Sequence, residues 1–210
     1  MLSGIGTVGG AVAVLIAAIV GRSAFADYRK QKLLERQIEH TDKALVCAYK
    51  LNMALSSIRS PMSTESESSE SEADLTARNQ FENVDADRRR LAIQANIFYI
   101  RARRHAEDFD DAVKALPFVK AYLGQKAFDA LSELIGCRNS VLVYANAYAD
   151  DRHVDSELSQ KITEHIWEGY GDVHQGDPIK RRIDTAIADL EEIALPILRL
   201  ESKRDKLGNV

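Results

Sequence analysis

The sequence has few residues that interrupt a helix. Proline occurs four times and glycine eleven times in 210 residues, and five of those glycines lie within the first 21 positions. The rest of the chain is therefore poor in the two residue types that most destabilise a helix interior. No segment shows a convincing alternation of apolar and polar residues, which is the pattern of a half-buried strand. The sequence predicts an all-α fold.

Cysteine is also scarce, with only Cys47 and Cys137 present. Two distant cysteines exclude a disulfide framework and a cysteine-based zinc site. Both lie in helical patterns, where we expect small, buried, apolar side chains. No serine, threonine or cysteine stands in a recognisable nucleophile motif. We therefore assign no catalytic, metal-binding or cofactor-binding residue.

Basic residues are not in excess, and the net charge is −4. A dedicated nucleic-acid-binding protein usually carries a basic surplus, so we do not expect nucleic acid as a partner. The composition is 45% hydrophobic and 29% charged, which is typical of a chain that buries a real core.

Charged side chains are absent from Met1 to Gly21, and Arg22 ends this run. A helix of ~21 residues is ~31 Å long, close to the thickness of a bilayer core. We expect a transmembrane anchor over residues 1–22. The positive charges that follow, on Arg22, Arg29, Lys30 and Lys32, predict a single-pass protein of the plasma (inner) membrane with its N-terminus outside and its C-terminal domain cytoplasmic.

The alternative for this segment is a signal peptide cleaved after Ala26, which would make the protein periplasmic or secreted. Ala24-Phe25-Ala26 matches the small-x-small pattern of a cleavage site. Signal peptides carry positive charge ahead of the apolar run, however, and here Arg22 follows it. The charge order favours the anchor.

Small residues recur along the expected anchor at spacings that share one helix face. These residues are Gly6, Gly9, Gly10, Ala13, Ala17 and Gly21. Such a face allows another helix to approach closely, so we predict a helix-packing face here. Gly4-x-Gly6-x-x-Gly9 also matches the dinucleotide-binding fingerprint, but no strand precedes it, so we reject that interpretation.

Apolar residues at spacings of three and four predict an antiparallel bundle of about four to five amphipathic helices after the transmembrane helix. The expected helices span residues 27–60, 78–116, 125–149 and 156–170, with a last one opening at Asp177-Pro178 and kinked or frayed at Pro196. Pro61 and Pro117 are expected to end the first two helices.

Five segments result from these patterns. They are a transmembrane anchor over 1–22, a long juxtamembrane helix over 23–62, a disordered Ser/Glu-rich linker over 63–76, a helical bundle domain over 77–202 that packs with 27–60, and a flexible tail over 203–210. The linker has almost nothing to bury, and its serines among acidic residues are candidates for phosphorylation.

Arginines cluster at two points of the helix expected over 78–116, at residues 88–90 and again at residues 101, 103 and 104. An ion-paired, solvated surface is one interpretation, because acidic residues follow directly. The functional interpretation is contact with anionic lipid headgroups. We assign that contact to Arg22, Arg29, Lys30, Lys32, Arg88, Arg89 and Arg90.

Two loops combine histidine with carboxylates. They contain Asp150, Asp151, His153 and Asp155 in one case and Asp172, His174 and Asp177 in the other. Their order matches no known metal loop, so we interpret them as helix-capping residues. Trp167 and Tyr170 stand near the second loop as either core residues or an exposed recognition patch.

These observations suggest a membrane-tethered helical module without evident catalysis that acts as a scaffold, a subunit or another protein-interaction module. Its partners would be the lipid bilayer and either another protein or a second copy of itself. The alternatives are an exported helical protein and a metal-dependent enzyme at the cytoplasmic face.

Overall fold

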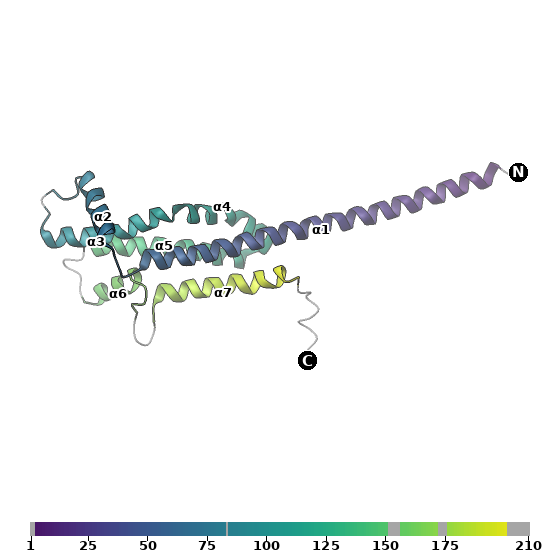
Figure 1. Ribbon diagram of the computed structural model, residues 1–210. Helices are drawn as coiled ribbons and strands as arrows, with labels where there is room; N and C mark the ends of the chain where they lie inside the picture. Colours follow the sequence, from purple (N-terminus) through teal and green to yellow (C-terminus); the bar gives the residue numbers. More distant parts are fainter. Residues whose placement is uncertain (1–2, 83, 151–155, 172–175, 201–210) are drawn as a thin grey trace, which may run out of the picture. The chain divides into compact units, whose positions relative to one another are not determined.

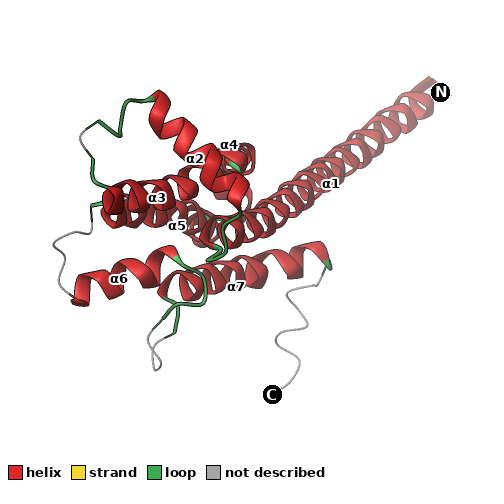
Figure 2. Ribbon diagram, turned by 60° about the vertical axis from the view of Figure 1, so that its left-hand side comes forward, coloured by secondary structure: helices red, strands yellow, loops and turns green. Residues whose placement is uncertain are grey.

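The computed structural model describes residues 3–82, 84–150, 156–171 and 176–200, with side chains at residue 22 and from residue 24 onward. Within these residues the chain forms helices and no strand, which confirms the all-α prediction (Figures 1 and 2). The helices are α1 (Ser3–Arg59), α2 (Glu65–Ala77), α3 (Ala86–Arg104), α4 (Ala106–Leu123), α5 (Gln125–Ala149), α6 (Ser156–Ile166) and α7 (Pro178–Leu198).

The chain divides into two compact units, Met1–Glu39 and His40–Val210. The division falls inside α1, at neither of the boundaries expected after residues 22 and 62. In the first unit, the side chains of Phe25, Tyr28 and Leu33 are all more than half exposed, at 63%, 56% and 58%.

The predicted plasma-membrane localisation with a single membrane-spanning helix is wrong. Among the residues with described side chains, no helix combines the length and the apolar character needed to cross a bilayer. The structure does not describe the surroundings of the small-residue face, so its packing role stays a prediction. The face consists of Gly6, Gly9, Gly10, Ala13, Ala17 and Gly21.

The second unit is a helical bundle built around α5, which packs against α3, α4, α6 and α7. The part of α1 in this unit contributes an apolar stripe to the same core. Leu45, Leu51, Leu55 and Ile58 are at most 5% exposed, so this part of the expected stripe is buried. Leu34, in the same expected helix over 27–60, lies in the first unit and is 45% exposed.

The Ser/Glu-rich segment expected to be a disordered linker is mostly helical, as α2. Thr64 caps the helix: its side chain accepts a hydrogen bond from the backbone N–H of Glu67, and the Glu67 carboxylate accepts one from the backbone N–H of Thr64. The prediction was wrong because it considered only apolar burial, whereas α2 is stabilised by its cap and by ion pairs with α3.

The helix expected over 78–116 is two helices, α3 and α4, which meet at His105. Asp85 caps the start of α3, where its side chain accepts the backbone N–H of Arg88. Pro117, expected to end the second helix, lies inside α4. The helix ends instead at Gly124, whose φ of 93° favours glycine and turns the chain directly into α5.

The C-terminal helices begin where the sequence predicts. Helix α5 has the expected bounds, and α7 opens with Asp177 as its cap and Pro178 in its first turn. Helix α6 ends at Ile166 rather than near Tyr170, and α7 continues beyond Pro196 to Leu198. The expected tail over 203–210 lies outside the described residues.

Candidate functional site

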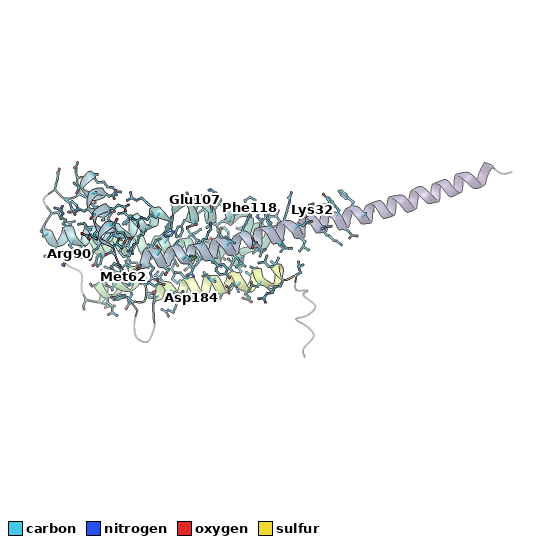
Figure 3. The ribbon with its side chains drawn as sticks, in the orientation of Figure 1. Lys32, Met62, Arg90, Glu107, Phe118 and Asp184 are labelled. Carbon is cyan, nitrogen blue, oxygen red and sulfur yellow. The ribbon has the colours of Figure 1, made fainter. Side chains whose placement is uncertain are left out.

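A groove runs between α1 and α4 in the second unit and has a volume of about 550 Å³. Val46 and Cys47 line it from α1, and Phe118 and Val119 line it from α4. Val46 and Phe118 are 46% and 50% exposed, which is high for large apolar side chains beside a core (Phe118 is labelled in Figure 3). The groove therefore presents apolar surface to the outside.

Stacked rings form part of the wall of this groove. The ring of His40 lies 4.8 Å from that of Phe118 and 4.7 Å from that of Tyr122, with interplanar angles of 5° and 19°. Phe118 and Tyr122 are four residues apart and so share a face of α4. The stack fixes the aromatic wall of the groove in place.

The rim of the groove carries charges that are neutralised within the chain. The ammonium group of Lys50 lies 3.6 Å from the carboxylate of Asp108, and that of Lys114 lies 3.1 Å from Asp111. Lys43 and Asp42 also line the rim. What the groove offers to a ligand is chiefly apolar contact.

The two thiols differ in their surroundings. Cys47 is half-buried in the groove, and burial raises its pKa. Cys137 is fully buried in the core, and burial raises its pKa to about 11. Raised pKa values make both thiols poor nucleophiles near neutral pH, so neither has the character of a catalytic cysteine.

A buried arginine links three helix ends. Arg59, the last residue of α1, is 1% exposed and places its Nη2 atom 2.8 Å from both carboxylate oxygens of Asp177. The same guanidinium donates hydrogen bonds to the backbone carbonyls of Glu164, His165 and Trp167. It thereby satisfies carbonyls at the end of α6, which have no partner within their own helix.

A second buried arginine, Arg101 of α3, makes a similar arrangement near the end of α1. Its Nε and Nη2 atoms lie 2.9 and 2.8 Å from the two carboxylate oxygens of Glu67, a bidentate pair. It also donates to the backbone carbonyls of Ser60 and Met62, at 2.7 and 2.6 Å. The hydrogen bonds from Arg101 to the Glu67 carboxylate hold the pKa of Glu67 at about 2, well below its usual range.

The arginine cluster of α3 is covered by the acidic residues of α2. Besides Arg101, Arg104 contacts both Glu67 and Glu70, and Arg103 lies 3.4 Å from Asp74. Arg89 pairs with Glu72 of α2, and its guanidinium also lies 4.5 Å from the centre of the Phe81 ring. Arg89, Arg101, Arg103 and Arg104 are therefore ion-paired, with acidic residues of α2 rather than with the acidic residues that directly follow the cluster.

The residues assigned to lipid contact are distributed over both units. Arg22, Arg29, Lys30 and Lys32 belong to the first, and Arg88, Arg89 and Arg90 to the second. Lys32 pairs with Glu35 at 2.6 Å, and Arg88 pairs with Asp150 at 3.2 Å. Arg90 is exposed (labelled in Figure 3). Contact of this set with anionic lipid stays a prediction.

The two acidic loops are described only in part, because Asp151, His153, Asp155, Asp172 and His174 lie outside the described residues. The two members that are described serve helix ends: Asp177 caps α7, and Asp150 follows the last residue of α5. Among the described side chains, no group of three or more His, Cys, Asp or Glu residues is arranged to hold a metal ion.

The two aromatic residues near the second loop have different environments. Trp167 packs against the core, with its ring 4.8 Å from that of Phe98, whereas Tyr170 is 52% exposed. They do not form a shared exposed patch.

The groove and the two buried arginines were not assigned as sites from the sequence. Val46, Cys47 and Phe118 had only their apolar character, which does not distinguish a groove from a core. No protein-family model, no curated protein and no solved structure matches this chain.

Proposed function

We propose that this chain is a helical protein-interaction module, acting as a scaffold or subunit, that binds one helix of another protein in the α1–α4 groove. The observation that carries the proposal is the exposed apolar surface of Val46 and Phe118 on either side of that groove.

The shape and the charges of the groove support a helix as the occupant. Two helices that leave an apolar groove between them offer a seat for a third, which inserts residues spaced by three, four and seven positions. Because Lys50 and Lys114 are paired with carboxylates of α4, the groove has little to offer a small polar ligand. The expected partner helix is amphipathic, with apolar residues facing the groove.

Site-specific photocrosslinking tests this function. A photoreactive residue at Val46 should give a discrete adduct with a partner protein in the cells that make this chain. The matched control is the same residue at Val143 of α5, which is 67% exposed and does not line the groove. Phe118→Glu should reduce the Val46 adduct strongly, because losing an aromatic anchor costs an interface about 2 kcal/mol or more.

Equal adducts from Val46 and Val143, or none from Val46, would count against the groove as a binding site. An adduct of the chain with itself would identify a second copy, rather than another protein, as the occupant. Light scattering of the purified protein would then show dimers that Phe118→Glu dissociates.

A further inference from the structure

Helix α2 is the most one-sidedly charged element of the second unit. Its thirteen residues include acidic side chains and no basic one. Glu67, Glu70 and Asp74 are spaced by three and four positions, so they share one face of the helix. Each of them pairs with an arginine of α3. The two helices therefore meet through complementary rows of charge.

The attachment of α2 is chiefly polar. Leu75 is the buried apolar side chain that α2 contributes, beside the polar Ser71 and Glu67. The hydroxyl of Ser71 donates to the backbone carbonyl of Ile93, and the amide of Asn96 donates to the carboxylate of Asp74. Little apolar surface therefore holds α2 in place, and the exposed ion pairs that accompany these hydrogen bonds weaken as salt rises.

The outer ion pairs are also open to solvent. The side chains of Arg104 and Glu70 are 49% and 47% exposed, and that of Arg103 is 54% exposed. A competing carboxylate can reach these guanidinium groups from solvent. By contrast, Arg101 is 5% exposed and engaged with backbone carbonyls, so it belongs to the folded framework.

We propose that the arginine row at the end of α3, formed by Arg103 and Arg104, is a binding surface for an acidic polypeptide segment of a partner protein, and that α2 is its built-in competitor. Detachment of the part of α2 that follows Glu67 exposes the row, and reattachment hides it, while Glu67 itself stays paired with Arg101. The surface is separate from the α1–α4 groove, so the proposal does not depend on the function assigned to that groove.

The geometry selects an acidic helix rather than a nucleic acid. The ligand that demonstrably fits these arginines is a helical polypeptide with carboxylates on one face, namely α2 itself. Its carboxylates recur once per helical turn and meet the arginines along α3, whereas a phosphodiester backbone follows a different repeat. The partner segment is expected to carry Asp or Glu at positions one, four and eight.

Competition by α2 sets the apparent affinity of an external ligand. A segment in the same chain acts at an effective concentration in the millimolar range. An external segment binds only during the fraction of time in which α2 is detached, and its apparent affinity falls by that fraction. Weakening the outer pairs of α2 should therefore strengthen binding of an added acidic peptide.

The test uses a fluorescent peptide with the sequence of residues 63–78 and the full chain. In the variant Glu70→Gln/Asp74→Asn, the outer pairs are weakened and the buried pair of Glu67 with Arg101 is kept. The peptide should bind this variant at least about tenfold more tightly than the wild type, by fluorescence anisotropy. Adding Arg103→Glu and Arg104→Glu should remove the binding.

The matched control is Glu107→Gln/Asp110→Asn on α4, which makes the same change in net charge on exposed residues away from α2 (Glu107 is labelled in Figure 3). It should bind the peptide no better than the wild type. Equal binding to all three proteins, or no binding to any, would overturn the proposal. Tighter binding of the variant to a single-stranded oligonucleotide than to the peptide would also overturn it, in favour of nucleic acid.

Hydrogen exchange of the wild-type chain provides a second measurement that needs no variant. Raising NaCl from about 50 mM to about 500 mM should accelerate exchange of the α2 amides more than that of the α5 amides, because salt screens the exposed pairs. An equal response of α2 and α5 would show that α2 does not detach separately, which contradicts the proposal.

Discussion

At the scale of single residues, the two buried arginines among the described residues of the second unit, Arg59 and Arg101, are both held at the ends of helices. A buried guanidinium is tolerated only when it is paired and hydrogen-bonded. Arg59 and Arg101 each have a carboxylate partner, and both bond to backbone carbonyls at or just beyond a helix C-terminus. The last carbonyls of a helix carry partial negative charge, so an arginine there is favoured by the helix dipole as well.

The pair of Arg101 with Glu67 predicts a specific loss of stability in acid. The pKa of Glu67 is about 2 in the folded chain, below the 4.5 of an unperturbed glutamate. The contribution of the Glu67 carboxylate to the free energy of unfolding is therefore fully present above pH ~4.5 and is lost as the pH falls towards ~2. The free energy of unfolding of the wild type should exceed that of Glu67→Gln at pH 7, and this gap should shrink by up to about 3 kcal/mol by pH ~2.

Urea unfolding at a series of pH values measures this gap. The control is Glu70→Gln, whose pair with Arg104 is half exposed and should contribute no more than about 1 kcal/mol at any pH. A gap between wild type and Glu67→Gln that does not change from pH 7 to pH ~2 would contradict the prediction.

At the scale of helices and loops, Arg59 joins the end of α1 to the end of α6 and the start of α7. Arg59→Lys keeps the positive charge but removes the forked guanidinium, so it cannot reach Asp177 and the three carbonyls together. We expect a loss of about 2–4 kcal/mol in the free energy of unfolding. The control is Arg78→Lys. Arg78 caps the end of α2 and forms an exposed ion pair with Asp74, so this substitution should change the free energy of unfolding by less than about 0.5 kcal/mol.

Thermal and urea unfolding of both variants measures these differences. A loss from Arg59→Lys as small as that from Arg78→Lys would mean that the ends of the three helices are held by apolar packing, with the buried arginine adding little.

Elements with local signals were predictable, and elements that depend on distant residues were not. Asp177-Pro178 is a cap followed by a first-turn proline, and both signals lie within the sequence of α7 itself. Helix α2 also has a local signal, the Thr64-x-x-Glu67 capping box, but no apolar pattern follows it, because the partners of α2 are arginines of α3 further along the chain. Neither glycine nor proline marks the break at His105, so the apolar periodicity predicted one continuous helix where there are two.

The candidate site was less predictable than the fold for a related reason. Apolar periodicity on α1 and α4 indicates which residues face other helices, but exposure depends on which neighbours are present. Val46 and Phe118 are apolar residues that no neighbouring helix covers fully. Only the packed arrangement of the second unit identifies that surface as a groove.

At the scale of the whole molecule, the core belongs to the second unit. Its buried cluster begins at Ala44 and ends at Ala194, so none of its members lies in the first unit, Met1–Glu39. Since burial of apolar surface is the main favourable term in folding, the second unit should contain what it needs to fold. The first unit contains one part of one helix, with exposed side chains such as Phe25 and Tyr28.

We therefore predict that a chain of residues 37–210 folds like the full-length protein. It keeps one helical turn before Thr41 and retains the stack of His40 with Phe118, so neither the core nor the groove loses a contact. Its melting temperature should lie within about 3 °C of the full-length value, since about 1 kcal/mol corresponds to 2–4 °C in a chain of this size. Circular dichroism melts of the two chains, measured in parallel, check this. A decrease of more than about 10 °C, or the loss of a cooperative transition, would show that residues 1–36 contribute to the stability of the second unit.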